Sequence, residues 1–158
     1  RGTAPRFRVS ARPGSGGGIM GTMSVSGLDD LIGDLDELAR LPDSVTDQML
    51  NAEADVIEAA QRAEASRMWK GPYYTGTTAA SIKKGKIKRT GLDKSITVAP
   101  QGHNKRGTRN AEVAFVNEFG KRGQPGRPAL KTANERKEQE AVAAGEKVYH
   151  AYLDGKKL

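Results

Sequence analysis

Hydrophobic and polar residues recur with helical spacing near the start of the chain. Leucine and isoleucine occupy every third or fourth position between Leu28 and Leu41, and aspartate and glutamate fill most of the positions between them. This spacing places the apolar side chains on one face of a helix. Ser26 can cap the start of the helix, and Pro42 ends it. The pattern therefore predicts an amphipathic helix over residues 28–41 with an acidic outer face.

A second, longer helix is predicted over residues 45–69. Asp43 or Ser44 can cap its start, and Gly71-Pro72 ends it. Its apolar face is rich in alanine, whose small side chain permits close approach of another helix. The residues predicted to line this face are Val45, Met49, Ala52, Val56, Ala60 and Ala63.

The spacing changes after this helix to the alternation that is typical of strands. Strands are predicted over residues 81–88 and 94–99, with a turn at Thr90-Gly91 between them. The third and best predicted strand covers residues 112–119, where successive side chains point to opposite faces.

Two polar, basic loops are predicted at residues 100–110 and 120–126, and we expect them to be mobile unless bound. Pro128 suits the first turn of a closing helix that runs to about Leu153, because its missing N–H costs no hydrogen bond there. The predicted order is helix, helix, three strands, helix. It indicates the α+β class: an N-terminal amphipathic helix, a long Ala-rich helix, a three- to four-stranded antiparallel sheet and a C-terminal helix.

The length of 158 residues suits one domain with arms. Residues 1–25 are rich in arginine and glycine and are predicted to form a flexible basic arm that orders on assembly. Residues 26–153 are predicted to form the single α+β domain, and residues 154–158 a basic tail. Hydrophobic residues make up 36% of the chain and aromatic residues 5%, which supports only a modest core and favours oligomerisation.

Positive charge dominates the middle of the chain, within a net charge of +7. Asp93 is the one acid between Arg67 and Arg109. Three interpretations remain open: a solvated row of lysines that protects a strand edge, a contact with an acidic protein face such as the first helix of a neighbouring copy, or nucleic-acid binding. The candidate basic contact surface comprises Lys83, Lys84, Lys86, Lys88, Arg89, Lys105, Arg106 and Arg109.

No pattern in the chain predicts catalysis or a cofactor. The absence of cysteine excludes disulfides, thiol catalysis and cysteine-ligated zinc. His103 and His150 have no partner ligand at metal-binding spacing. The glycines of residues 14–18 are not followed by the Lys-Ser/Thr of a phosphate-binding loop. We therefore expect no enzyme, cofactor or metal site, and no membrane contact, because no apolar run approaches the ~20 residues of a membrane span.

Glu118 stands apart from the other carboxylates because it lies inside the third predicted strand. A carboxylate in that position needs a partner, and Arg127 and Lys121 are near it in sequence. We expect Glu118 to form a structural ion pair or a subunit contact rather than to act in catalysis.

Several short motifs follow one another in a recognisable order. Thr75-Gly76 and Ser81-Ile82 belong to a segment that begins at Pro72; Phe115 to Gly120 reads FVNEFG, and Arg127 to Leu130 reads RPAL. With the opening Gly27-Leu28-Asp29-Asp30-Leu31, they make residues 26–148 resemble the head–tail joining, or tail completion, proteins of siphophages, a family typified by the gene-ten product of a lambdoid coliphage. Tyr74, Thr78, Ala129 and Thr132 depart from the family pattern.

The resemblance implies a structural protein of the virion neck, assembled in the host cytoplasm. It implies a homo-oligomeric ring, expected to be hexameric, that contacts the head-closure protein, the tail terminator and the tail tube, and transiently DNA in the channel. It supplies no active site. A tail terminator and a nucleic-acid-binding module remain the alternatives. The implied interface residues are Thr75, Gly76, Ser81, Ile82, Phe115, Glu118, Phe119, Gly120, Arg127, Pro128 and Leu130. Gly76 and Gly120 follow the ends of elements, where turns favour a positive φ.

Overall fold

The structure is a computed structural model that describes residues 7–9, 23–25, 33, 36 and 41–156. The chain divides into two compact units, residues 1–42 and 43–158. In the first unit, β1 (Phe7–Val9) pairs antiparallel with β2 (Met23–Val25). The helix predicted over residues 28–41 lies outside the described residues except at positions 33, 36 and 41. The predicted arm lies outside them except for the two strands.

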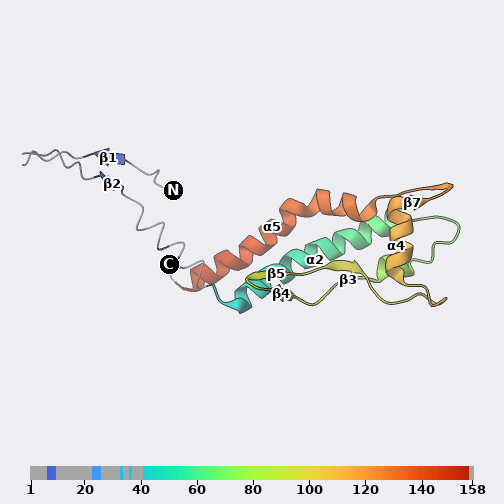
Figure 1. The fold of residues 1–158 in the computed structure, drawn as a ribbon, viewed down its shortest axis with the longest axis horizontal. Coiled ribbons are helices and arrows are strands. Elements are labelled where there is room, and N and C mark those ends of the chain that lie inside the picture. Colours follow the sequence, from blue (N-terminus) through green and yellow to red (C-terminus); the bar gives the residue numbers. More distant parts are fainter. Residues whose placement is uncertain (1–6, 10–22, 26–32, 34–35, 37–40, 157–158) are drawn as a thin grey trace, which may run out of the picture. The chain divides into compact units, whose positions relative to one another are not determined.

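Two long helices, α2 (Asp43–Met68) and α5 (Ala129–Gly155), lie side by side in the second unit (Figure 1). They confirm the predicted helices over residues 45–69 and from Pro128 to about 153. Their contact is built mainly from small residues, which allow the two backbones to approach closely. The buried residues are Val45, Ala54, Gln61 and Ala65 of α2 and Ala129, Ala133, Ala141 and Gly145 of α5.

The buried face of α2 is only partly the predicted one. Val45 is buried as expected, but Ala63 is exposed, and Ala54 and Ala65 are buried in its place. Alanine is frequent all round this helix, so its composition alone does not select a face. The position of α5 does.

An interrupted hairpin runs beside α2. The strand β3 (Ile82–Lys84) pairs antiparallel with β6 (Val98–Pro100), and β4 (Lys88–Thr90) pairs antiparallel with β5 (Asp93–Ser95). Between these ladders the backbone N–H of Gly85 donates to the carbonyl of Thr97 at 2.7 Å. The two strands predicted on either side of Thr90-Gly91 are therefore present, each broken into two short segments.

The third predicted strand is wrong, because Asn110–Phe119 forms a helix, α4. Its valines and phenylalanines favour a strand by propensity. However, Asn110, Ala114 and Glu118 recur every four residues and are buried together on one helical face. Packing of this face against the core and the start of α5 outweighs the weak local preference.

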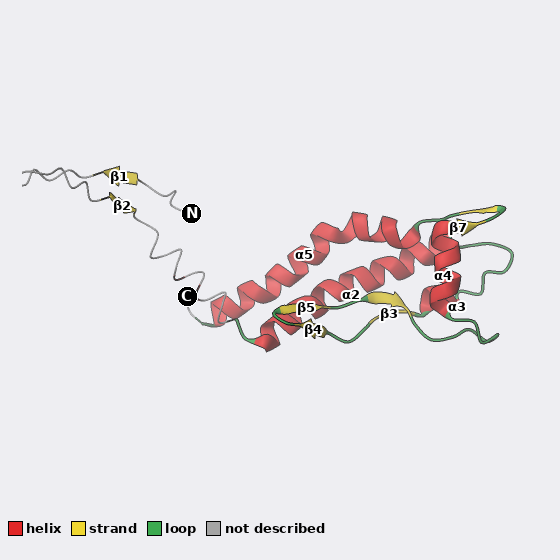
Figure 2. Ribbon diagram, viewed as in Figure 1, coloured by secondary structure: helices red, strands yellow, loops and turns green. Residues whose placement is uncertain are grey.

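Short elements complete the unit. The helix α3 (Thr77–Ala80) precedes the hairpin, and β7 (Gly120–Lys121) and β8 (Gln124–Pro125) form a small antiparallel ladder between α4 and α5. Figure 2 shows the predominance of helices over short strands. The α+β class with a C-terminal helix is confirmed. The described strands pair in ladders of two, rather than in one sheet of three or four.

The core lies where the end of α2 meets α3, α4 and the start of α5. It consists of Ala65, Trp69, Ala79, Ile82, Ala114 and Ala129, with Met68, Val98 and Leu130 packed against it. Trp69 is 3% exposed, and its Nε1 donates to the carbonyl of Arg127 at 3.0 Å. One tryptophan surrounded by small residues makes a modest core, as the composition indicates.

Candidate assembly surface

Glu118 and Arg127 lie where the ends of three helices meet. The Glu118 carboxylate accepts hydrogen bonds from the backbone N–H groups of Leu130 (3.0 Å) and Lys131 (2.9 Å) in the first turn of α5. The free N–H groups and the dipole at a helix start both favour a carboxylate there. Glu118 therefore has the partner that its burial requires, but the partner is the start of α5 rather than the side chain of Arg127 or Lys121.

Arg127 stabilises the end of a different helix. Its guanidinium donates to the carbonyls of Met68 (3.3 Å) and Lys70 at the C-terminal end of α2. Its own N–H donates to the carbonyl of Asn117 at 2.7 Å, near the end of α4. Cationic donors suit the carbonyls that a helix end leaves unpaired. Arg127 thus links α2, α4 and the start of α5.

Gly120 and Gly126 bring the β7–β8 ladder against the end of α4. Gly120 has a φ of 81°, and a Cβ there would lie 2.6 Å from both the carbonyl oxygen of Gln124 and the nitrogen of Gly126. A Cβ on Gly126 would lie 2.6 Å from the carbonyl oxygen of Glu118. No side chain fits in this backbone-to-backbone contact. The expectation of positive φ at Gly120 is confirmed, as it is at Gly76, whose φ is 75°.

Phe115 and Phe119 form an exposed aromatic pair on the outer face of α4. They are 62% and 71% exposed, and their ring centroids lie 4.8 Å apart. A hollow of about 440 Å³ beside the pair is lined in part by Pro100, Ala111 and Leu130. Exposed aromatic surface next to an apolar hollow is typical of protein–protein contacts. These two residues are the members of the predicted interface set that expose large apolar side chains.

Most of the other predicted interface residues serve the fold. Ile82 is fully buried in the core, Leu130 packs against that core, and the Ser81 hydroxyl donates to the carbonyl of Thr78. Thr75 and Pro128 are exposed and precede α3 and α5. The motifs thus gather around the junction of helix ends, and only their aromatic members add a broad apolar face to the surface.

Part of the basic contact surface is paired within the chain. Lys84 binds Asp55 at 2.6 Å, and Arg89 binds Asp43 at 2.6 Å. Both acids belong to α2, so these cations attach the hairpin to its own long helix. Lys84 and Arg89 thus belong to the fold of the chain as well as to the predicted basic contact surface.

Lys94 joins the same attachment. Its Nζ lies 2.6 Å from Asp47 and 3.2 Å from Asp43. The hydrogen bond from Arg89 lowers the pKa of Asp43, and the hydrogen bond to Asp47 raises the pKa of Lys94. Both shifts favour the charged forms, which means that the ion pairs are formed over a wide pH range.

Other members of the basic surface remain available to partners. Within the described residues, Lys83, Lys86, Lys88, Lys105 and Arg106 are exposed and form no ion pair. The loop carrying Lys105 and Arg106 is organised by Asn104, whose Oδ1 accepts from the N–H groups of Arg106 (2.9 Å) and Thr108 (3.0 Å). Arg109 lies 4.0 Å from Glu112.

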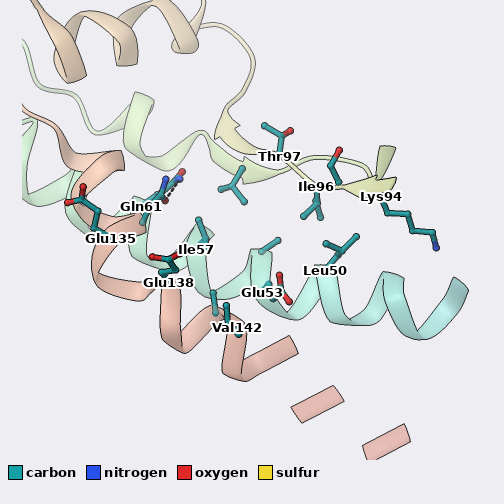
Figure 3. Close-up of a pocket in the computed structure, with 15 residues that line it drawn as sticks. Leu50, Glu53, Ile57, Gln61, Lys94, Ile96, Thr97, Glu135, Glu138 and Val142 are labelled. Carbon is teal, nitrogen blue, oxygen red and sulfur yellow. Dashed lines mark hydrogen bonds between the residues drawn. The ribbon is translucent and has the colours of Figure 1, made fainter. Parts of the chain in front are cut away.

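A groove of about 750 Å³ lies between α2, α5 and the β5–β6 side of the hairpin (Figure 3). Its apolar lining includes Leu50, Ile57, Ile96, Val98 and Val142, and its acidic lining Glu53, Glu135 and Glu138. The sequence patterns did not reveal this groove, because its walls come from three elements that are far apart along the chain.

The described residues contain no group of three or more histidine, cysteine, aspartate or glutamate side chains placed to hold a metal ion. Within the same part of the chain, no helix has the length and apolar character needed to cross a membrane. The chain matches no family model, no curated protein and no solved structure.

Proposed function

We propose that this protein is a structural component of the neck of a tailed-phage virion. In this proposal, copies of the chain form a homo-oligomeric ring that joins the head connector to the tail. The ring works by complementary surfaces and needs no cofactor. A tail terminator would use the same kind of ring and is the nearest alternative.

The exposed pair of Phe115 and Phe119 carries this proposal. It belongs to the FVNEFG motif on which the resemblance to head–tail joining proteins rests. The neighbouring motif residues Glu118 and Gly120 hold the end of α4 rigidly by the contacts to Leu130 and Gly126. An apolar face on a rigid support loses little conformational entropy when a partner covers it, and this favours assembly.

The test is to measure the mass of the purified full chain by sedimentation velocity, alone and with the neck proteins of the same virus, and to image the particles by electron microscopy. We expect closed rings that bind a connector or a tail tube. A chain that remains monomeric at all concentrations and joins no neck assembly would overturn the proposal.

Nucleic-acid binding is a second candidate function, favoured by the exposed and unpaired Lys83, Lys86 and Lys88 within the described hairpin. It predicts that affinity for DNA falls steeply with salt. Reversing the charge of all three lysines to glutamate should abolish DNA binding while rings still form. Loss of rings with unchanged DNA binding would instead identify the lysines as a protein contact.

A further inference from the structure

The groove between α2, α5 and the hairpin combines apolar walls with hydrogen-bond acceptors that lack donors. Val142 is 48% exposed, and Leu50, Ile57 and Ile96 are half-buried along the walls. Glu53 and Glu138 form no hydrogen bond or ion pair with any described residue. Burial raises the pKa of Glu53, which means that its charge is poorly solvated.

Gln61 adds a third acceptor. It is 4% exposed and lines the groove (Figure 3). Its Nε2 donates to Oδ1 of Asn134 at 2.9 Å, while its buried Oε1 has no partner among the described residues. A buried acceptor without a donor costs free energy of folding. The groove therefore suits an occupant with N–H donors, positive charge and an apolar stem.

The β7–β8 ladder presents such a segment. Lys121 ends β7 and Arg122 follows it in the turn before β8, and both are exposed and form no ion pair with the described residues. Their aliphatic stems can cover apolar walls while their heads reach carboxylates. The ladder projects from the end of the unit where α4 lies (Figure 1). The close backbone contacts at Gly120 and Gly126 hold it there.

We propose that the Lys121–Arg122 turn of one copy docks in the groove of a second copy. The two cations then face Glu53 and Glu138, and their stems lie against the apolar walls. The donor turn and the acceptor groove are different surfaces of the chain, so the contact is heterologous. Such contacts repeat from copy to copy and close into rings when the rotation permits. This inference rests on the proposed ring and identifies one of its subunit contacts.

Charge reversal tests this contact in the full-length protein. Arg122→Glu and Glu138→Lys should each raise the dissociation constant of self-association about tenfold or more, because each places like charges together. An equimolar mixture of the two variants should restore assembly, since alternating copies then pair opposite charges at every contact. Lys147→Glu and Glu146→Lys are matched controls at exposed positions outside the contact and should change little.

The outcomes separate this inference from the proposed function. If the wild-type chain assembles but neither charge reversal weakens its self-association, the proposed contact is wrong and the ring remains supported. The same holds if the equimolar mixture of the two variants does not assemble. If the wild-type chain never assembles, both fail. If the mixture recovers assembly and the controls assemble normally, the contact is confirmed.

Cysteine cross-linking identifies the occupant, since the chain has no cysteine of its own. A mixture of Lys121→Cys and Glu138→Cys chains should form a disulfide-linked dimer of unlike variants under mild oxidation. A double variant that cross-links only within one chain would show that a copy's own turn fills the groove, and would overturn the proposal. So would the absence of any cross-link in an assembled sample.

Discussion

Glu118 and Arg127 stabilise the ends of two different helices. The Glu118 carboxylate accepts the N–H groups of Leu130 and Lys131 at the start of α5, and the Arg127 guanidinium donates to the carbonyl of Met68 at the end of α2. The carbonyl of Arg127 in turn accepts the indole N–H of Trp69. A glutamate and an arginine that suggest an ion pair in sequence thus act as two separate caps around one core.

Replacing Glu118 with alanine should destabilise the fold strongly. It leaves two N–H groups at a partly buried helix start without an acceptor, which costs roughly 2–4 kcal/mol of unfolding free energy. Urea unfolding measures the change. Glu112→Ala is the control, because Glu112 is exposed on the same helix and should cost below about 0.5 kcal/mol. Equal effects of the two substitutions would contradict the capping role.

Replacing Gly120 with alanine should be far more damaging than the same change at Gly123. Both glycines have a positive φ, 81° and 79°, so both changes strain the backbone. The ψ of 177° at Gly120 adds a conformation that only glycine adopts readily. Only at Gly120 does the new Cβ meet backbone atoms, at 2.6 Å; at Gly123 nothing lies within 4 Å. The difference between the two unfolding free energies measures the steric clash together with the glycine-only conformation of Gly120. Similar values would show that the β7–β8 ladder moves aside freely.

The attachment of the hairpin to α2 should weaken in acid. Because Asp43 has a lower pKa in the folded chain than its ordinary value of 3.8, its ionised form stabilises the fold above that pH. This stabilisation is lost as the pH falls through the lowered pKa. Asp43→Asn should therefore reduce stability most at pH 7 and less at a second, acidic pH below 3.8. Urea unfolding at the two pH values checks this; an effect independent of pH would exclude the ion pairs as its cause.

Lys94 gives the complementary dependence in alkali. Its pKa is raised above 10.5 in the folded chain, so its contribution is present below that pH and disappears as the pH rises through the raised pKa. Lys94→Met, which keeps much of the apolar stem, should lower the thermal midpoint at pH 7. Lys86→Met, at an exposed position without a described acid partner, should not. An equal drop in both variants would show that the loss of any positive charge, rather than the pairing of Lys94 with Asp43 and Asp47, lowers the thermal midpoint.

Glu53→Gln should affect folding and assembly in opposite directions. Because burial raises the pKa of Glu53, its ionised form disfavours the folded monomer at neutral pH, and stability rises as the pH falls through that raised pKa. The neutral amide removes this cost and should raise the thermal midpoint of dilute protein at pH 7. The same change removes a charge facing the proposed docking turn and should weaken self-association, measured by sedimentation. Stronger association of the variant would argue against a cationic occupant.

Replacing Phe115 and Phe119 together with serine should leave the monomer folded but reduce ring formation. The two phenyl side chains are largely exposed, so their loss removes little buried area from the monomer. Circular dichroism and sedimentation velocity measure the two outcomes. Leu92→Ser is the control, since Leu92 is 96% exposed and lies in the turn between β4 and β5. If the double variant forms oligomeric rings as readily as the wild-type chain, the aromatic pair is not an assembly contact.

The sequence by itself determined the long helices and their ends. The spacing along α2, the stop at Gly71-Pro72 and the start at Pro128 are local signals, because they act through backbone hydrogen bonds within a few residues. The strand segments around Thr90-Gly91 followed from equally local turn chemistry. The positive φ at Gly76 and Gly120 could be read in the same way.

Only the tertiary structure decided the rest. Residues 110–119 form a helix because Ala114 packs in the core and Glu118 accepts hydrogen bonds from the start of α5. The free energy of these contacts exceeds the weak local preference for a strand. The pairing of Lys84 with Asp55, and the groove between α2, α5 and the hairpin, depend on residues that are distant in sequence. No local pattern encodes such proximity, because α2, α5 and the hairpin meet only when the chain folds.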